Sequence, residues 1–177
     1  MSDRRRKTYA GIGARRTPPG VQLVMESLAT KLAGAGWTVR SGGAPGADRA
    51  FEGAAAAVDP ELVETYRTDG GWSALADLTP GGPSPDAYEL AASVHPAWSR
   101  CSDRAKALHA RNCHEILGPD LDDPVSFVVC WTRDGSLDGT GRRSGGTGQA
   151  LRLASRHSVP VFNLARLEHL GRIGRYL

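Results

Sequence analysis

The sequence predicts a doubly wound α/β domain of the Rossmann type, in which helices cover both faces of a parallel sheet. Short apolar segments alternate with segments of helical period along the chain, which is the pattern of right-handed β-α-β crossovers. Three glycine-rich turns each follow a predicted strand. The almost wholly apolar run 125–131 has the composition of a central parallel strand that is buried on both faces.

The first half of the chain predicts β-α-β-α-β. After the first strand, Thr17 and Pro18 suit the N-cap and the first position of a helix. That helix has one apolar face and ends at Gly34 and Gly36. The predicted strands cover residues 7–12, 37–40, 62–66, 125–131 and 159–163.

The second half adds a loop and helix insertion after the third strand. Residues 68–85 are rich in Gly, Pro, Ser and Asp and predict a long loop, which in compact domains is often a lid. Pro160 predicts either that the last strand lies at an edge of the sheet or that this proline stands at the start of the strand. The predicted helices cover residues 87–94, 102–117 and 147–156.

The expected strand order is 3-2-1-4-5, which reverses between the first and the fourth strands. Doubly wound sheets bind ligands at such a reversal, outside the carboxyl ends of the strands. The glycine turns at 11–15, 41–48 and 144–149 then converge on one site, where glycines let the backbone approach a ligand and helix N-termini attract anions.

Composition favours one compact domain over residues 1–177. The chain is 40% hydrophobic and 23% charged, with a net charge of +3 and a pI of about 9.0. Part of this charge lies in the basic run 4–7, and short basic runs near a terminus are most often solvated and bind no nucleic acid. Three cysteines without paired spacing, and no apolar run of membrane length, lead us to expect a reducing cytoplasm and no membrane partner.

Two common nucleotide motifs are missing. Arg16 replaces the third glycine of a dinucleotide fingerprint, and no P-loop sequence occurs. His109 and Cys113 share a helical face, but no second pair at metal spacing accompanies them, so we expect neither a metal nor a cofactor. The tryptophans at positions 72, 98 and 131 suit packing or stacking on a base.

The residues resemble a known group. Tyr9-Ala-Gly-Ile-Gly13, the second turn and Gly145-Gly-Thr-Gly-Gln149 are similar to the SLOG superfamily of Rossmann-like nucleotide-binding proteins, which includes DNA-processing protein A and the Lonely Guy phosphoribohydrolases. His95-Pro-Ala-Trp98, Leu108-His-Ala-Arg-Asn112 and Val129-Cys-Trp131 are similar to small phage and prophage proteins of the DNA-processing-A-like kind. This resemblance implies a homodimer or higher oligomer, paired through helices beside the nucleotide site.

The predicted function is binding of a nucleotide or a nucleotide-derived molecule, for sensing or sequestration. Arg111 suits a phosphate or an exposed ion pair with Glu115, and Asn112 suits a loop or the ligand. Asp48 suits the helix N-terminus, the glycine loop or a ribose hydroxyl. The predicted ligand-binding residues are Gly11, Gly13, Arg15, Ser41, Gly42, Gly43, Gly46, Asp48, Arg111, Asn112, Gly145, Gly146, Thr147, Gly148 and Gln149.

Two alternatives remain open. An N-glycosidic hydrolase of the Lonely Guy type has glutamates where this chain has Leu151 and Arg152, so catalysis would need another carboxylate, such as Asp48, Glu115 or Asp134. Binding of single-stranded DNA, by analogy with DNA-processing protein A, lacks a dense basic face in the sequence.

Overall fold

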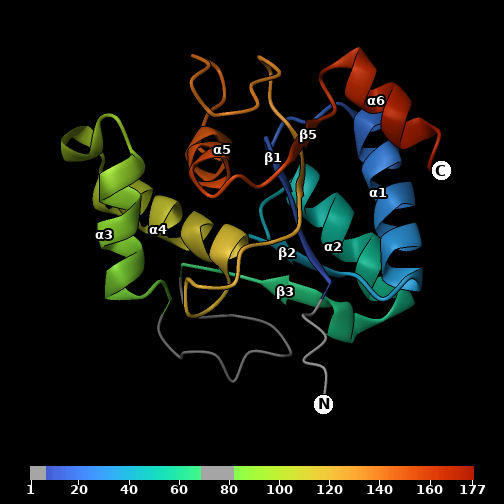
Figure 1. Ribbon diagram of the computed structural model, residues 1–177, viewed down its shortest axis with the longest axis horizontal. Coiled ribbons are helices and arrows are strands. Elements are labelled where there is room, and N and C mark those ends of the chain that lie inside the picture. The colour runs from blue at the N-terminus through green and yellow to red at the C-terminus, as the bar shows by residue number, and fades with distance from the viewer. Residues whose placement is uncertain (1–6, 69–81) are drawn as a thin grey trace.

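The computed structural model describes residues 7–68 and 82–177 (Figure 1). Most of the basic run 4–7, most of the predicted loop 68–85 and Trp72 lie outside the described residues. Within the described part of the chain, no helix has both the length and the apolar composition that a membrane span requires.

The five strands form one sheet in which every neighbouring pair is parallel, in the order β3-β2-β1-β4-β5. This confirms the predicted fold class and strand order. The strands are β1 (Thr8–Gly13), β2 (Thr38–Ser41), β3 (Val63–Thr65), β4 (Val128–Trp131) and β5 (Val161–Asn163). The last strand begins directly after Pro160 and lies at an edge, where a missing N–H is tolerated.

Helices cover both faces of the sheet, with α1 and α2 on one side and α3, α4 and α5 on the other (Figure 1). The helices are α1 (Pro19–Gly34), α2 (Ala47–Val58), α3 (Pro85–Val94), α4 (Asp103–Leu117), α5 (Thr147–Arg156) and α6 (Leu167–Gly174), with 3-10 turns η1 (Pro60–Leu62) and η2 (Trp98–Arg100). The sequence did not predict α6, which spans only about two turns.

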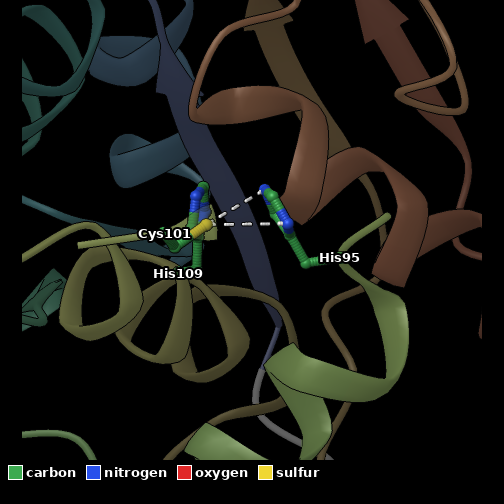
Figure 2. A group of neighbouring side chains, drawn as sticks. All are labelled: His95, Cys101 and His109. Atoms are coloured by element: carbon green, nitrogen blue, oxygen red, sulfur yellow. Dashed lines mark hydrogen bonds between the residues drawn. The ribbon is translucent and has the colours of Figure 1, made fainter. Parts of the chain in front are cut away.

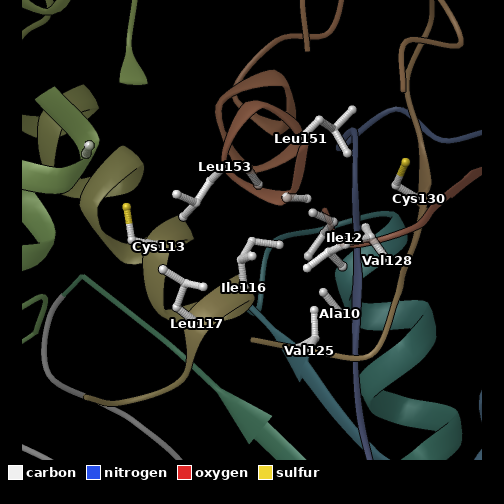
Figure 3. Close-up of a cluster of buried hydrophobic side chains, with 14 of the residues drawn as sticks. Ala10, Ile12, Cys113, Ile116, Leu117, Val125, Val128, Cys130, Leu151 and Leu153 are labelled. Atoms are coloured by element: carbon white, nitrogen blue, oxygen red, sulfur yellow. The ribbon is translucent and has the colours of Figure 1, made fainter. Parts of the chain in front are cut away.

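The core lies in two clusters, one on each face, because successive side chains of a strand point to opposite faces. Ala10, Ile12 and Val128 face α4 and α5 (Figure 3), whereas Tyr9 and Val129 face α1 and α2. The central strands are therefore buried on both sides, which explains their continuous apolar composition.

Two local predictions were wrong. Thr17 is not the N-cap of α1: its hydroxyl donates to the carbonyl oxygen of Ala14 (2.7 Å) and closes the first glycine turn, and Pro18 occupies the N-cap. The apolar run 125–131 forms a regular strand only from Val128. The N–H of Val125 instead donates to the carbonyl oxygen of Ile116 near the end of α4 (2.8 Å), which ties the start of the run to that helix.

Candidate functional site

A cavity of about 600 Å³ opens at the carboxyl ends of β1 and β4, where the strand order reverses. Its walls come from the turn after β1, the turn before α5 and one side of α4. Small-molecule sites typically enclose about 300–1,000 Å³. The cavity therefore has the position and the size for a ligand as large as a nucleotide.

The structure brings more than half of the predicted site residues to this cavity and places the rest nearby or behind it. The predicted residues that line it are Gly13, Arg15, Asp48, Arg111, Asn112, Gly145, Gly146 and Thr147. Gly42 and Gly43 line an adjoining cavity of about 220 Å³, together with Arg49, Arg67 and Arg111.

The first turn contributes Gly13 and Arg15, whereas Gly11 has a packing role. A side chain at Gly11 would lie 2.5 Å from Cγ of Phe51, so the absence of Cβ lets α2 approach β1. Ser41 also acts inside the fold, since its buried hydroxyl donates to the carbonyl oxygen of Gly11 (2.6 Å). Arg15 is exposed and stands at the rim of the cavity.

Acidic side chains already bond to the second turn. The N–H of Gly43 donates to Glu52 (2.9 Å), and the N–H of Ala44 donates to Asp48 (3.2 Å). Gly46 has φ of 87°, and a side chain there would collide with the carbonyl oxygen of Arg15. This turn therefore binds carboxylates of the chain itself and packs against the first turn.

The third turn has open donors. Among the described residues, no acceptor bonds to the N–H groups of Gly145, Gly146 and Thr147, and no side chain caps α5. The amide of Asn112 donates to the carbonyl oxygen of Gly146 (3.0 Å), which fixes the turn against α4. These N–H groups lie at a helix N-terminus that lines the cavity, which is the arrangement that binds phosphate.

The segment before this turn is held by Asp134. One oxygen of its carboxylate accepts from the N–H of Arg143 (2.9 Å) and from the hydroxyl of Ser144 (2.9 Å). Burial opposes the ionised form, but hydrogen bonds from Thr132 and then from these two groups lower the pKa of Asp134. The exposed Arg143 is thereby placed at the rim of the cavity, beside the third turn.

Gly148 and Gln149 lie behind the third turn. A side chain at Gly148 would lie 2.7 Å from Cβ of Ser144, and Gln149 is fully buried with its amide nitrogen 3.8 Å from the sulfur of Cys113. Neither residue lines the cavity, so both support the turn from inside.

Arg111 forms a buried charge cluster at the base of the cavity. Its Nη1 bonds to Glu115 and lies 3.8 Å from Asp48, while the three side chains are at most 9% exposed. A side chain at Gly42 would overlap the guanidinium, so the second turn leaves room for it. Arg111 and Glu115 therefore do not form the exposed helix pair that their spacing allowed.

The carboxyl groups of this cluster hold their protons strongly. Burial raises the pKa of Asp48, and repulsion from Glu115 adds to the effect, although Arg111 opposes it. Burial likewise raises the pKa of Glu115, again against the attraction of Arg111. Of the alternative catalytic carboxylates, Asp48 and Glu115 line the cavity, whereas Asp134 orders a loop. Leu151, at a position where Lonely Guy enzymes have a glutamate, belongs to the core.

His95 and His109 also line the cavity, although no pattern in the sequence places them together. Their ring centroids lie 4.4 Å apart, and Cys101 lies beside them (Figure 2). Burial lowers the pKa of both imidazoles, that of His109 to about 4. Cys113, the cysteine expected near His109, contacts the carbonyl oxygens of His109 (3.6 Å) and Ala87 (3.7 Å) and does not belong to this group of side chains.

Arg143 was missed, although a signal for it exists. Arg143 directly precedes the third glycine turn, and Arg15 ends the first one, so in both cases an arginine in the sequence adjoins glycines that line the cavity. The pair of histidines carries no such signal, because the two residues belong to separate segments that meet only in the folded chain.

No protein-family model and no curated protein matches the chain. Among solved structures, it is similar to DNA processing protein A from Helicobacter pylori, described for its mode of binding single-stranded DNA. The TM-score is 0.55 at 20% sequence identity, and the match covers 89% of this chain but only 65% of that one. The likeness supports a fold of the DNA-processing-protein-A type.

Proposed function

We propose that residues 1–177 act as one nucleotide-binding domain of the SLOG type, which captures a nucleotide or a nucleotide-derived molecule in the 600 Å³ cavity. The observation that carries this proposal is the third turn, whose open N–H groups at the start of α5 face a cavity between the exposed Arg15 and Arg143. Three unpaired cysteines suit the reducing cytoplasm that we assign to this function.

In this proposal the phosphate binds Gly145, Gly146 and Thr147, and not the second turn. The second turn is the weaker anion site because two of its N–H groups, those of Gly43 and Ala44, already donate to Glu52 and Asp48, and these acidic side chains occupy the place of an anion. Arg15 and Arg143 add charge from two sides. The apolar wall formed by Ala105 and Leu108 of α4 then receives the base or its equivalent.

The test compares two pairs of neighbouring arginines by calorimetric titration with AMP, GMP, CMP and UMP. Arg15→Ala and Arg143→Ala should each weaken binding of the preferred nucleotide by about one to two decades, since a charge-assisted bond contributes roughly 1.5–3 kcal/mol. Arg16→Ala and Arg142→Ala are the controls, because both side chains are exposed and neither lines the cavity. Affinities equal to the wild type for all four variants would contradict the proposal.

Arg111→Ala is less suited to this test. The substitution removes the cation that faces two buried carboxyl groups, which typically costs about 3–5 kcal/mol of stability. Its effect on binding would therefore be mixed with an effect on folding. Arg15 and Arg143 avoid this problem because they are exposed.

Binding of single-stranded DNA is the second candidate, favoured by the likeness to a solved protein that binds it. The exposed residues Arg15, Arg16, Arg142 and Arg143 would then act together on the phosphate backbone. An oligothymidylate of about 20 nucleotides is the probe, and its affinity should fall steeply with salt. In that case Arg16→Ala and Arg142→Ala would weaken binding as much as the other two variants.

N-glycosidic hydrolysis is tested on the same titration samples, in which chromatography detects any free base that is released. We expect no free base, because Leu151, which is buried, and Arg152, which is half-buried, occupy the positions where Lonely Guy enzymes have glutamates. Repeated turnover would assign the enzymatic function instead, and its loss in Asp48→Asn or Glu115→Gln would identify the carboxyl group.

A further inference from the structure

Three side chains with metal-binding atoms meet at the connection between α3 and α4. His95 ends α3, Cys101 ends η2 and His109 lies in α4 (Figure 2). One ligand atom from each of the three lies within 4.8 Å of the others. The sulfur of Cys101 is 3.8 Å from Nδ1 and 3.9 Å from Nε2 of His95.

These distances are close to those around a tetrahedral zinc ion. Zn–N bonds of about 2.0–2.1 Å and Zn–S bonds of about 2.3 Å place neighbouring ligand atoms roughly 3.3–3.6 Å apart. The sulfur of Cys101 and the ring of His95 need only a small approach to reach this spacing. Imidazole and thiolate are also the ligands that zinc prefers.

An independent observation comes from His109. Its Nδ1 is buried and has no hydrogen-bond partner among the described residues. A buried polar nitrogen without a partner is costly, and such atoms often mark a missing ion or ligand. The thiol of Cys101 is also weakly bonded, because besides its long contacts to the ring of His95 it has a 3.6 Å contact to the carbonyl oxygen of Ala97.

The connection itself holds the three residues in place. The N–H of Ala97 donates to Nδ1 of His95 (3.1 Å), and the hydroxyl of Ser102 caps α4 by accepting from Ala105 (3.3 Å). Coordination through Nδ1 of His95 replaces the bond from Ala97.

We propose that His95, Cys101 and His109 bind one zinc ion, with a fourth position open to the 600 Å³ cavity. His95 and His109 both line that cavity, so the open position faces it. Three protein ligands and an exchangeable fourth are the pattern of a reactive zinc site, whereas structural sites use four protein ligands. The zinc proposal does not depend on which molecule binds in the cavity.

The test titrates the metal-free, full-length chain with zinc chloride against a chromogenic chelator. The wild type should bind one zinc ion per chain. Cys101→Ser and His109→Gln should weaken binding by about 100-fold or more, since even residues outside the ligand set often matter tenfold to 100-fold. Cys113→Ser and His157→Gln are matched controls outside the cluster and should bind as the wild type does.

A second measurement does not depend on the folding of any variant. Co²⁺ bound to the wild type should show the near-ultraviolet charge-transfer absorption of a thiolate ligand. A wild type that binds no zinc, a Co²⁺ complex without the thiolate band, or equal affinities for the wild type and Cys101→Ser would each overturn the proposal.

Discussion

Arg111 sets the charge balance at the base of the cavity, because it faces two acidic side chains that are both buried. Asp48 and Glu115 are 4% and 2% exposed, and one guanidinium nitrogen serves both. A single positive charge cannot neutralise two ionised carboxyl groups in a site with little water. One of the two therefore retains its proton to higher pH than an ordinary carboxyl group.

This arrangement predicts how stability varies with pH. The pKa of Asp48 and of Glu115 is raised in the folded chain, so the folded state holds protons that the unfolded state releases above about pH 4. The resulting stability is complete below that pH and is lost as the pH rises through the folded pKa. The free energy of unfolding in urea should therefore contain a part that falls with pH, by at most about 1.4 kcal/mol per proton and pH unit.

Glu115→Gln isolates that contribution. The variant should show a flatter decline than the wild type, because glutamine cannot titrate. Histidines whose pKa is lowered by burial act in the opposite direction, but equally in both proteins, so the difference between the two curves reports the carboxyl group. Parallel curves for the wild type, Glu115→Gln and Asp48→Asn would show that the cluster does not titrate in this way.

The sequence predicted which of these residues lie at the cavity better than it predicted whether their side chains are buried. Arg111, Asp48 and Asn112 were all expected near a ligand, and all three line the cavity. The spacing of Arg111 and Glu115 could not distinguish an exposed pair from a buried one, since the same i, i+4 separation occurs on every face of a helix. Burial depends on what packs against α4, which the local pattern does not contain.

The turns between strands and helices use their glycines for different purposes. The third turn leaves three N–H groups open, whereas the second donates two of its own to Glu52 and Asp48. Gly11 admits the ring of Phe51. All three turns look alike in sequence, since composition does not reveal which acceptor each N–H meets. The cluster of His95, Cys101 and His109 was missed for a related reason, because its members come from three separate segments.

Two glycine substitutions near α2 test the packing role. Gly11→Ala should lower the free energy of unfolding by about 1–3 kcal/mol, since its Cβ would lie 2.5 Å from the ring of Phe51. Gly53→Ala, inside α2 with nothing within 4 Å of a Cβ, should instead raise it by about 0.5–1 kcal/mol through better helix propensity. Urea denaturation measures both, and a harmless Gly11→Ala would remove the packing explanation.

For the whole molecule, the alternation of strands and helices was enough to predict the fold class and the strand order. This succeeded because right-handed crossovers and buried parallel strands allow few arrangements of five β-α units. The short helix α6 escaped prediction because eight residues give too few turns to show a helical period. It covers the core with Leu170 and Ile173.

The oligomeric state remains a prediction of the same resemblance that suggested the nucleotide site. We expect at least a dimer, paired through helices beside the candidate site, of which α4 lines the cavity. Light scattering at micromolar concentration should give at least twice the mass of one chain. A mass of 18.8 kDa would show that the chain is a monomer under these conditions.

If the open N–H groups of the third turn bind the phosphate of a nucleotide, their amide chemical shifts report on that contact directly. A ¹⁵N-labelled chain titrated with AMP, GMP, CMP or UMP should show its largest shifts at Gly145, Gly146 and Thr147, followed by Arg15. The same spectra should leave Gly43 nearly unchanged, because its N–H already donates to Glu52. Saturating shifts centred on the second turn, or no shifts with any of the four nucleotides at millimolar concentration, would contradict this assignment.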